Sequence, residues 1–383
     1  MKIVFISCYF NHHQKALCDC LYKETDGDFY FIATEKMSEE RRRLGYQNMT
    51  ASYVISINDT QLTSDVKDLI NKADLVILGD ARTTLVEERL RQNKLTFLYS
   101  ERIYKRPVSY SRLLVHKLKF YYRYRRHKTL YLLCAGAFAA SDYYRVGCFK
   151  NKAFKWGYFP QTIHYNNIDS IIARKYSNRN TLGKVKICWA GRFIAWKHPE
   201  VMIEVARSLR NDNISFSMVL IGDGPLSADI ELLTKKYKLI DDVHLLGAMN
   251  PNNVRKEMEE SDIFLFTSDR NEGWGAVLNE AMNSLCAVIA NKAIGSVPFL
   301  IQNGKNGFIY DGSDFDDLYF KVKNIIQCYD IRTSVSKEAY NTIVGEWNAK
   351  KAVDRLVQLS RNIDTNKQIF SSGLCSIAEI IKD

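Results

Sequence analysis

Short apolar runs recur along the whole chain, and amphipathic stretches separate them. One series of six runs lies at 2–7, 29–33, 53–57, 75–79, 95–99 and 130–134. A second series of six lies at 184–189, 216–221, 243–246, 263–266, 287–290 and 307–310. Continuous apolar runs of this length are typical of parallel strands whose two faces are covered by helices. The sequence therefore predicts the α/β class, with two doubly wound, Rossmann-like domains that face a central cleft.

The two series of strands imply two domains. A chain of 383 residues, 46% of them hydrophobic, can bury two ordinary cores. Between the series, residues 160–183 are rich in Asn, Ser and Arg and show little periodicity, so we interpret them as the interdomain connection. Residues 1–165 would then form the first domain and 184–345 the second. A helical tail, 346–383, is expected to pack back on the first domain.

Cysteine usage and hydropathy both bear on the compartment. The nine cysteines include no Cys-x-x-Cys pair and no Cys and His spacing that suits zinc, which favours free thiols in a reducing cytoplasm. The longest uncharged run, 129–141, is well short of the roughly 20 apolar residues that span a bilayer. The opening run 2–7 is too short for a secretory signal. We therefore expect a cytoplasmic protein without a membrane-spanning segment.

The positive charge of the chain, +11 in all, is concentrated in one stretch. Residues 101–130 carry ten Lys or Arg against the single acidic Glu101, and 117–128 interleaves such bases with aromatic residues. This pattern suits the headgroup layer of an anionic membrane, and a solvated helix face fits it about equally well. No nucleic-acid module surrounds the stretch. We expect peripheral contact with the inner face of the plasma membrane through 102–128, or a solvated face, and no nucleic acid.

Two carboxylates, Glu272 and Glu280, lie eight positions apart across a Gly-x-Gly turn, directly after the apolar run 263–266. This order places Glu272 in the loop at the carboxyl end of a strand and Glu280 in the next helix. Ligands of open α/β sheets bind at that edge, and the N–H groups that open the helix favour an anion such as a diphosphate. Glu280 can accept hydrogen bonds from the two vicinal hydroxyls of a ribose, while Glu272 can meet a sugar ring.

The expected helix after this turn has two different faces. Its i, i+3, i+4 and i+7 positions predict a core face, made of Leu278, Ala281, Met282 and Leu285. The face predicted to meet the ligand is small and polar, made of Ala276, Asn279, Glu280 and Asn283.

A second motif follows the first strand of the second series. Gly191 permits a tight exit from the strand, and Arg192 and Lys197 place two cations around the start of the next helix. A planar guanidinium and a flexible ammonium together neutralise a diphosphate well. The alternative interpretation is that both residues are surface bases that flank the start of a helix. We interpret the glycine turn 222–225 as mainly structural, and the strand end at Leu246 as a reader of a base edge.

These motifs together resemble the retaining family 4 glycosyltransferases, also called glycosyl transferase group 1, which have the GT-B fold. The chain shares their Glu-x7-Glu and Gly-Arg-x4-Lys patterns. Order and spacing agree through about 184–312, with further similarities at 222–225, 243–247, 295–298 and 303–307. The resemblance implies a first domain for the acceptor and a second for a nucleotide sugar.

By position, the resemblance implies a role for each residue. Arg192 and Lys197 would hold the nucleotide diphosphate, Glu280 the ribose, and Glu272 the donor sugar or its phosphate. Glu272, Arg192 and Lys197 would be catalytic. The other implied donor-binding positions are Gly191, Leu246, Gly273, Trp274, Gly275, Ala276 and Val277, the last five through their amides. No cofactor and no metal is implied, because the cations stabilise the leaving diphosphate, and a UDP-sugar is favoured as donor.

The amino-terminal half departs from the family pattern. Where many relatives carry a Gly-Gly turn after the first strand, this chain has Asn11, His12 and His13. The two imidazoles are candidates for contact with the acceptor or the donor phosphate, although His13 could also merely begin a helix. A His that relatives often carry after a later strand is missing too. Glu101 is the expected cleft residue in its place, and Asp80 is a weaker candidate.

The residues and the resemblance together predict a reaction. We expect transfer of a hexosyl unit from a nucleoside diphosphate sugar to an acceptor hydroxyl, with the anomeric configuration retained. The expected setting is bacterial surface polysaccharide synthesis (capsule, exopolysaccharide or lipopolysaccharide), with a saccharide acceptor that can be lipid-linked. Two alternatives stay open: a nucleotide-sugar epimerase or hydrolase of the same fold, and a non-catalytic nucleotide-sugar-binding subunit that regulates a partner.

Overall fold

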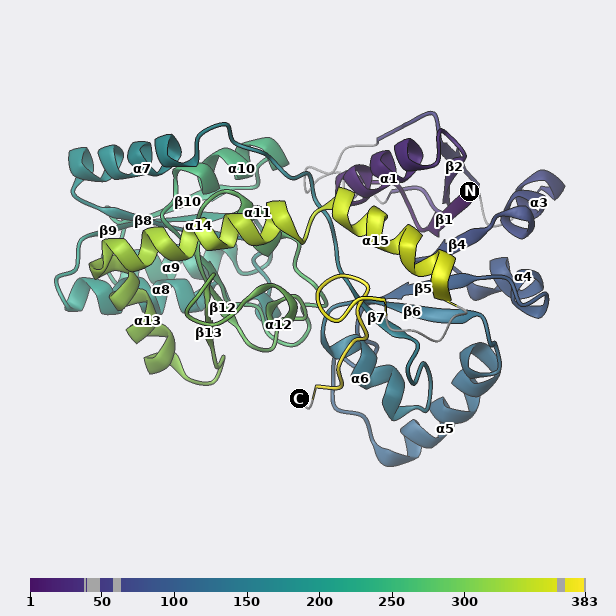
Figure 1. Ribbon diagram of the computed structural model, residues 1–383. Helices are drawn as coiled ribbons and strands as arrows, with labels where there is room; N and C mark the ends of the chain where they lie inside the picture. The colour runs from purple at the N-terminus through teal and green to yellow at the C-terminus, as the bar shows by residue number, and fades with distance from the viewer. Residues whose placement is uncertain (38, 40–48, 58–62, 364–368, 382–383) are drawn as a thin grey trace. The chain divides into compact units, whose positions relative to one another are not determined.

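A computed structural model of the protein describes residues 1–37, 39, 49–57, 63–363 and 369–381. The chain divides into two units. The first comprises Met1–Gln161 together with Glu346–Asp383, and the second comprises Thr162–Gly345. Each unit contains one sheet with helices around it, and the named strand pairs within each sheet are parallel (Figure 1).

The first unit is built on a seven-stranded sheet in the order β3-β2-β1-β4-β5-β6-β7. Its strands are β1 (Ile3–Ser7), β2 (Phe29–Ala33), β3 (Val54–Ser56), β4 (Leu75–Leu78), β5 (Thr96–Ser100), β6 (Leu130–Ala135) and β7 (Ala153–Trp156). Its helices are α1 (His12–Glu24), α3 (Ser64–Lys72), η1 (Thr83–Val86), α4 (Glu87–Arg91), α5 (Tyr110–Phe120), the π-helical η2 (Tyr121–Arg125), α6 (Phe138–Arg145) and α15 (Ala349–Asn362).

The second unit is built on a six-stranded sheet in the order β10-β9-β8-β11-β12-β13. Its strands are β8 (Val185–Ala190), β9 (Phe216–Ile221), β10 (Val243–Gly247), β11 (Ile263–Phe266), β12 (Ala287–Asn291) and β13 (Phe308–Tyr310). Its helices are α7 (Ile168–Leu182), η3 (Ala195–Lys197), α8 (Glu200–Asn211), α9 (Ser227–Lys236), α10 (Pro251–Glu260), α11 (Val277–Asn283), α12 (Val297–Leu300), α13 (Phe315–Gln327) and α14 (Tyr329–Gly345).

Burial explains why the apolar runs form the central strands. Every residue of β1, β4, β11 and β12 is buried, as expected for parallel strands with helices on both faces. Each of the twelve predicted runs coincides with one observed strand to within one residue at either end. The prediction of a two-domain, Rossmann-like α/β fold is therefore confirmed.

One strand, β7, was not predicted, because its short sequence Ala-Phe-Lys-Trp interrupts the apolar pattern with Lys155. It lies at the edge of the first sheet, beside β6. Residues near the carboxyl end of the chain pair with its free side: Lys155 N donates to Ser376 O at 2.8 Å, and Cys375 N donates to Lys155 O at 2.9 Å. An antiparallel bridge between Phe154 and Ile377 continues this pairing.

The interpretation of residues 160–183 as an irregular connection was wrong for most of its length. Residues 168–182 form helix α7 within the second unit, and the division between the units falls after Gln161. The Asn167 side chain accepts from Ser170 N at 3.1 Å and so caps the start of this helix. Periodicity was hidden because the inward side of α7 includes the charged Lys175 beside the apolar Ile171 and Ile172.

The chain returns to the first unit after Gly345. Helix α15 then packs on α1, as Figure 1 shows. Its apolar side, which includes Ala352, Val353 and Leu356, is buried. Among the described residues, no helix combines the length and the apolar character needed to cross a membrane.

Candidate functional site

The strand order of the second sheet reverses between two neighbours, β8 and β11. Strands β9 and β10 continue the sheet on the β8 side, while β12 and β13 continue it on the β11 side. The loops that leave the carboxyl ends of β8 and β11 therefore diverge, and a ligand crevice forms at such a switch point. The first loop carries Arg192 and Lys197, and the second carries Glu272. The structure thus brings together the two motifs that the sequence singled out.

The ammonium of Lys197 forms an ion pair with Oε2 of Glu272. The two side chains are only 13% and 11% exposed, so each charge is largely compensated by the other. Ser268 Oγ donates to the same Glu272 oxygen at 3.0 Å, and the Lys197 ammonium also lies 4.8 Å from the centre of the Trp196 ring. An incoming anion that takes over Lys197 would release the Glu272 carboxylate to accept hydrogen bonds from a neighbouring hydroxyl.

A chain of hydrogen bonds fixes the backbone of Lys197 to the core of the sheet. The buried Trp189 of β8 donates through Nε1 to Thr267 Oγ1 at 2.8 Å. The Thr267 hydroxyl in turn donates to the carbonyl of Lys197 at 2.7 Å. Sequence reasoning missed both Trp189 and Thr267. The sequence did show a Trp near the end of one central strand, β8, and a hydroxyl residue directly after another, β11, and these could have pointed to the two residues.

Glycines allow the loops around the switch point to lie close together. A Cβ on Gly222 would lie 1.9 Å from the carbonyl oxygen of Gly191, and one on Gly224 would lie 2.6 Å from that of Phe193. Gly275 has φ +82°, and its Cβ would lie 2.3 Å from the Phe266 ring. These close approaches give the glycine turn 222–225 a structural role, as its sequence indicated.

Glu280, the second carboxylate of the motif, lies in the short helix α11. Its side chain is partly exposed, and burial raises the pKa of its carboxyl group, against the opposite influence of Arg255. Arg255 Nη1 donates to the backbone oxygen of Glu280 at 2.9 Å rather than to its carboxylate. No hydrogen bond from another described residue reaches the Glu280 carboxylate, so its oxygens remain available to a ligand's hydroxyls.

Other predicted donor residues have different surroundings. Arg192 is exposed in the loop after β8, and Leu246 is half-buried at the end of β10, on the same carboxyl edge of the sheet. Gly273 and Ala276 are buried, and Val277 begins α11. The predicted core face of this helix is confirmed, because Leu278, Ala281, Met282 and Leu285 are all buried.

The prediction of a ligand-facing polar side on α11 was wrong for two of its members. Asn279 is buried, and its Oδ1 accepts from Nε1 of the fully buried Trp274 at 2.9 Å. Asn283 is buried too, and its side chain pairs with the backbone N and O of Ile163 at 2.8 and 3.0 Å. Their amides satisfy buried polar groups, which sequence spacing does not distinguish from a ligand contact. The Trp274 side chain likewise belongs to the core.

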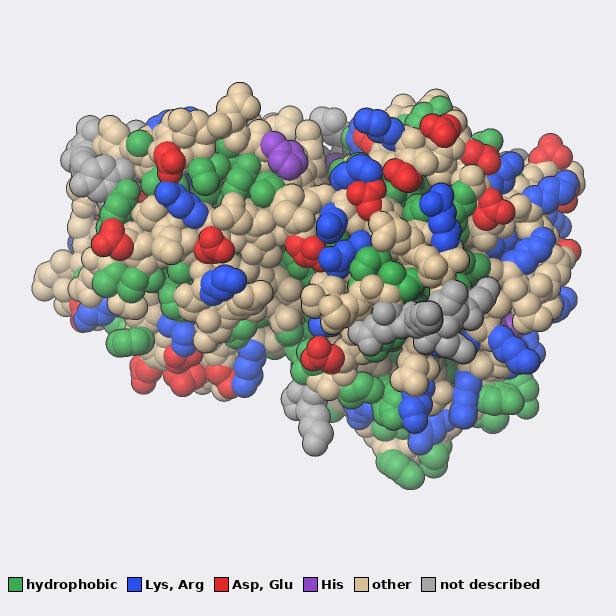
Figure 2. All heavy atoms as spheres, in the orientation of Figure 1, with side chains coloured by type: hydrophobic (Ala, Val, Ile, Leu, Met, Phe, Trp, Pro, Cys, Tyr) green, Lys and Arg blue, Asp and Glu red, His purple; other side chains and the backbone are tan. Residues whose placement is uncertain are grey.

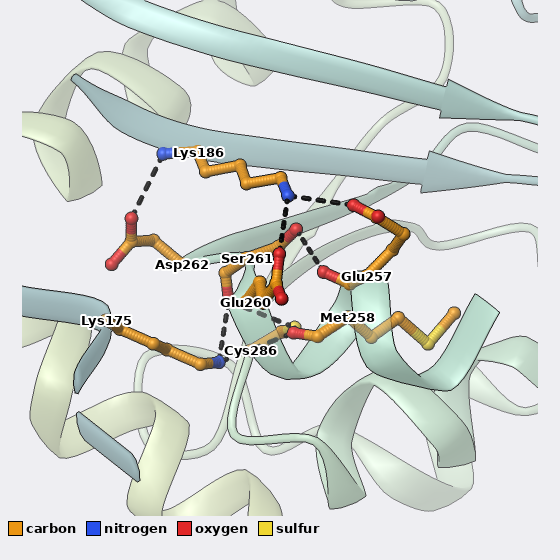
Figure 3. Close-up of polar contacts among 8 residues, drawn as sticks. All are labelled: Lys175, Lys186, Glu257, Met258, Glu260, Ser261, Asp262 and Cys286. Carbon is orange, nitrogen blue, oxygen red and sulfur yellow. Dashed lines mark hydrogen bonds and ion pairs between the residues drawn. The ribbon is translucent and has the colours of Figure 1, made fainter. Parts of the chain in front are cut away.

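A buried lysine on α7 binds the backbone carbonyls that follow α11, and sequence reasoning missed this lysine. The ammonium of Lys175 donates to the carbonyls of Ser261, Ser284 and Leu285 at 2.6, 2.9 and 2.8 Å. These carbonyls follow the carboxyl ends of α10 and α11, where the helix dipole favours a cation. Figure 3 shows the Lys175 ammonium beside Ser261 and Met258, and burial lowers the pKa of this ammonium. Lys175 therefore fixes the end of the helix that carries Glu280.

The first sheet has a switch point of its own, between β1 and β4. A pocket of about 550 Å³ lies there, and it brings together four of the amino-terminal candidates, Asn11, His13, Asp80 and Glu101. His12 is not among its lining residues; burial lowers the pKa of its imidazole.

Two of these pocket residues already have structural partners. Asn11 caps α1, since its Oδ1 accepts from His13 N at 2.9 Å and its own N donates to Gln14 Oε1 at 3.1 Å. Glu101 accepts from the Tyr158 hydroxyl at 2.8 Å, and burial raises the pKa of that phenol well above its ordinary value. The pocket therefore presents a carboxylate whose orientation is fixed by a neighbouring hydroxyl. Among the described residues, no three His, Cys, Asp or Glu side chains gather as metal ligands would.

Comparison with known proteins adds three findings. Residues 173–342 match the model of the glycosyl transferases group 1 family. A subunit of phosphatidylinositol N-acetylglucosaminyltransferase from Schizosaccharomyces pombe is 32% identical over 183 residues, which cover 45% of this chain and 39% of that protein. The chain spans about a third to two fifths of the length of such curated relatives.

Solved structures resemble the whole chain in fold. HepE from Anabaena, solved with UDP and with UDP-glucose, has a TM-score of 0.67 in its UDP complex at 15% identity, covering 95% of this chain and 99% of that one. The lipopolysaccharide outer core galactosyltransferase WaaB has a TM-score of 0.59 at 14% identity, covering 90% and 99%. At these identities the likeness shows a shared fold.

Proposed function

We propose that this chain, whose residues 173–342 match the model of the glycosyl transferases group 1 family, transfers a hexosyl unit from a nucleoside diphosphate sugar to an acceptor hydroxyl. The observation that carries the proposal is the nearly buried pair of Lys197 and Glu272 at the switch point of the second sheet. UDP is favoured as the nucleotide because HepE, which has the same fold, was solved with UDP and with UDP-glucose.

In this proposal the charged residues divide the donor between them. Arg192 and Lys197 bind the diphosphate, and the backbone N–H groups of 273–277 add hydrogen bonds to it. Glu280 accepts from the ribose hydroxyls. Glu272, released from Lys197 when the diphosphate binds, accepts from a hydroxyl of the sugar. Leu246 lies at the strand end expected to meet the base.

The reaction exchanges one C–O bond for another at the anomeric carbon. The bond to the diphosphate oxygen breaks while the acceptor oxygen bonds to the same face, so the configuration is retained. The acceptor proton passes to an oxygen of the departing diphosphate, which makes a separate side-chain base unnecessary. Negative charge grows on the diphosphate as the bond breaks, and the two cations, already held in place, lower the barrier without a metal or a cofactor.

We place the acceptor in the pocket of the first unit, where Glu101 and His13 can bind its hydroxyls. A surface polysaccharide of bacteria, assembled on a lipid-linked carrier at the inner face of the membrane, fits an acceptor of this kind. The shared fold with WaaB, a lipopolysaccharide galactosyltransferase, supports this setting.

The decisive experiment begins with a thermal-shift panel of UDP, GDP and ADP and their hexose conjugates. A ligand that binds the folded state raises the melting temperature by mass action. The sugar nucleotide that gives the largest shift is then incubated with and without oligosaccharide acceptors, in EDTA, and the products are followed by anomeric proton NMR. A new glycosidic bond of the donor's configuration supports the proposal.

Each alternative predicts a different product. An epimerase or hydrolase would convert the donor without any acceptor, and a regulatory subunit would bind the sugar nucleotide without turnover. Transfer that stops in EDTA and returns with a divalent ion would contradict the metal-independent mechanism.

A further inference from the structure

Helix α5 and its continuation η2 present an unusual surface on the first unit. No residue of α5 is buried. Six of the fifteen exposed large hydrophobic side chains among the described residues lie in these two short helices: Tyr110, Leu114, Val115, Leu118, Tyr121 and Tyr122, which are 46% to 74% exposed. Such a concentration of apolar side chains in water is costly for a surface without a partner.

The exposed side chains share one face of the helix. Leu114, Val115 and Leu118 recur at spacings of three and four, and the following turn continues the face with Tyr121 and Tyr122. We call this set, with Tyr110, the apolar face of α5.

The opposite side of the helix holds it to the unit. The His116 ring is stacked on Tyr104, with Nδ1 hydrogen-bonded to its hydroxyl at 2.7 Å, and the Phe120 ring lies 6.1 Å from that of Tyr143. The apolar face therefore points away from the body of the unit to which α5 belongs.

Basic residues border the apolar face, and acidic ones are absent from the sequence around it. Between Arg102 and Lys128 the chain has no Asp or Glu. At 100° per residue, Lys117 and Lys119 lie on either side of Leu118, and both are exposed. In Figure 2, green and blue side chains lie side by side over the area where Figure 1 shows α5. An apolar centre with basic flanks is the pattern of a helix that lies in the headgroup layer of an anionic membrane.

A cationic pocket of about 430 Å³ lies where this helical segment ends. Its lining residues include no acid, and they are Tyr124, Arg125, His127, Leu130, Tyr144, Gly147, Phe149, Lys150 and Lys152. Arg125 lies 5.9 Å from the Tyr121 ring of the same segment, so the pocket adjoins the apolar face. Lys152 donates to the carbonyl of Lys128 and lies 5.2 Å from the Tyr131 ring.

The loop that carries Lys150 is held in an unusual conformation. Phe149, a bulky residue, has φ +58°, and its ring is fixed by contacts with the rings of Tyr124 at 5.8 Å and Tyr143 at 5.3 Å. Asn151, on the other side of Lys150, also has φ +58°. The backbone that presents this lysine is therefore set by the aromatic core beneath it.

We propose that the apolar face of α5 lies in the headgroup layer of an anionic bilayer, and that the pocket beside it binds the phosphate of one lipid headgroup through Arg125, Lys150 and Lys152. The surface belongs wholly to the first unit, and it shares no residue with the switch-point residues to which we assign donor binding. The membrane surface and the transferase activity can therefore fail separately. Nucleic acid would satisfy the cations but would leave the apolar face exposed.

The first arm of the test concerns the apolar face. The full chain is floated with vesicles of phosphatidylcholine containing 30% phosphatidylglycerol and with vesicles of phosphatidylcholine alone, at about 0.05 to 0.5 M salt. We expect binding to the anionic vesicles that weakens as salt rises. Leu114→Glu/Leu118→Glu should lower the partition coefficient on the order of tenfold or more, since it removes two apolar insertions and adds negative charge. The matched control is Leu232→Glu, which replaces a 65% exposed leucine on α9 of the second unit and should bind like the wild type.

The second arm concerns the pocket. Lys150→Glu should weaken binding to the anionic vesicles by roughly thirtyfold, because each cation near an anionic surface contributes about 1 kcal/mol and the substitution changes two charges. The control Lys67→Glu makes the same charge change at an exposed position of α3 in the same unit. All variants should keep the wild-type melting temperature and the wild-type rate of hexosyl transfer to a soluble oligosaccharide acceptor.

Two results would overturn the inference. One is that the variant Leu114→Glu/Leu118→Glu and the variant Lys150→Glu both bind anionic vesicles as tightly as the wild type does. The other is tight binding to a duplex oligonucleotide with none to vesicles, which would assign the cations to nucleic acid. A loss of equal size in Lys67→Glu and Lys150→Glu would reject the pocket and reduce the effect to overall charge.

Discussion

Lys175 offers a direct test of how the second unit supports its carboxylate helix. In Lys175→Met the side chain keeps a similar volume, but the carbonyls of Ser261, Ser284 and Leu285 lose a charged donor. Hydrogen bonds to a charged group contribute about 1.5–3 kcal/mol each, so about 6 kcal/mol is lost. Relief of the buried charge's desolvation offsets several kcal/mol of that loss. The net destabilisation we expect is about 3 kcal/mol.

Thermal denaturation converts this value into an observable shift. A unit of this size loses about 2–4 °C per kcal/mol, so Lys175→Met should lower its melting temperature by about 6–12 °C. The matched control is Lys186→Met, also drawn in Figure 3, whose ammonium pairs with Glu257 at 2.8 Å and Glu260 at 3.4 Å near the surface. Such a pair contributes about 0–1 kcal/mol, and we expect a shift of at most about 4 °C.

The same variants report on the donor site. Lys175 holds the end of α11, which carries Glu280, so Lys175→Met should need a higher UDP concentration than Lys186→Met to gain the same thermal stabilisation. Equal melting temperatures for the two variants would refute the reasoning. A melting temperature of Lys175→Met within about 2 °C of the wild type would do the same.

Three further predictions concern the switch point of the second sheet. Arg192→Ala should lower transferase turnover by roughly 10²–10³-fold at an unchanged melting temperature, because the side chain is exposed and its proposed role is to stabilise the leaving diphosphate; unchanged turnover would remove it from the reaction. Gly275→Ala should be markedly less stable than Gly304→Ala in urea unfolding. Both glycines have φ near +80°, but only at Gly275 would an added Cβ lie within 3 Å of an aromatic ring. An equal loss of unfolding free energy in the two variants would mean that backbone strain alone matters. Burial raises the pKa of Glu280 in the folded protein, so the protonated carboxyl should stabilise the fold below its ordinary pKa, and this stabilisation should be lost as pH rises through the raised pKa. The melting temperature of the wild type should therefore fall over that pH range more than that of Glu280→Gln. Parallel profiles of melting temperature against pH would contradict the assignment.

The sheets of both units could be predicted from the sequence because their central strands are buried on both faces. In a run such as 263–266 both faces of the strand are buried, so every residue is apolar. An uninterrupted apolar run of this length is easy to recognise as a buried strand. Strand β7 lacks this property, since it lies at an edge and includes Lys155. Helix α7 was hidden for a related reason: the position that should mark its core face is Lys175, a cation stabilised by carbonyls distant in the sequence.

The candidate site could be predicted where charged residues directly follow a predicted strand. Lys197 and Glu272 each belong to a motif at the end of a predicted strand, so both could be chosen as donor-site residues from the sequence, and the structure adds the ion pair between them at the switch point. The interpretation of Asn279 and Asn283 was wrong because a helical period does not tell a buried hydrogen bond from a ligand contact. The direct support of Lys197 by Thr267 depends on pairings between β8 and β11 that residue spacing does not contain.

The pairing of Ser376 and Cys375 with β7 bears on how this protein is made. The second unit is a single continuous segment, Thr162–Gly345, and can fold as soon as it leaves the ribosome. The first unit also includes α15 and residues 375–378, which are translated after the second unit. Until they arrive, β7 exposes unpaired backbone groups to which another nascent chain can add a strand. Of the two units, the one whose translation starts earlier is thus the one whose sheet is completed later.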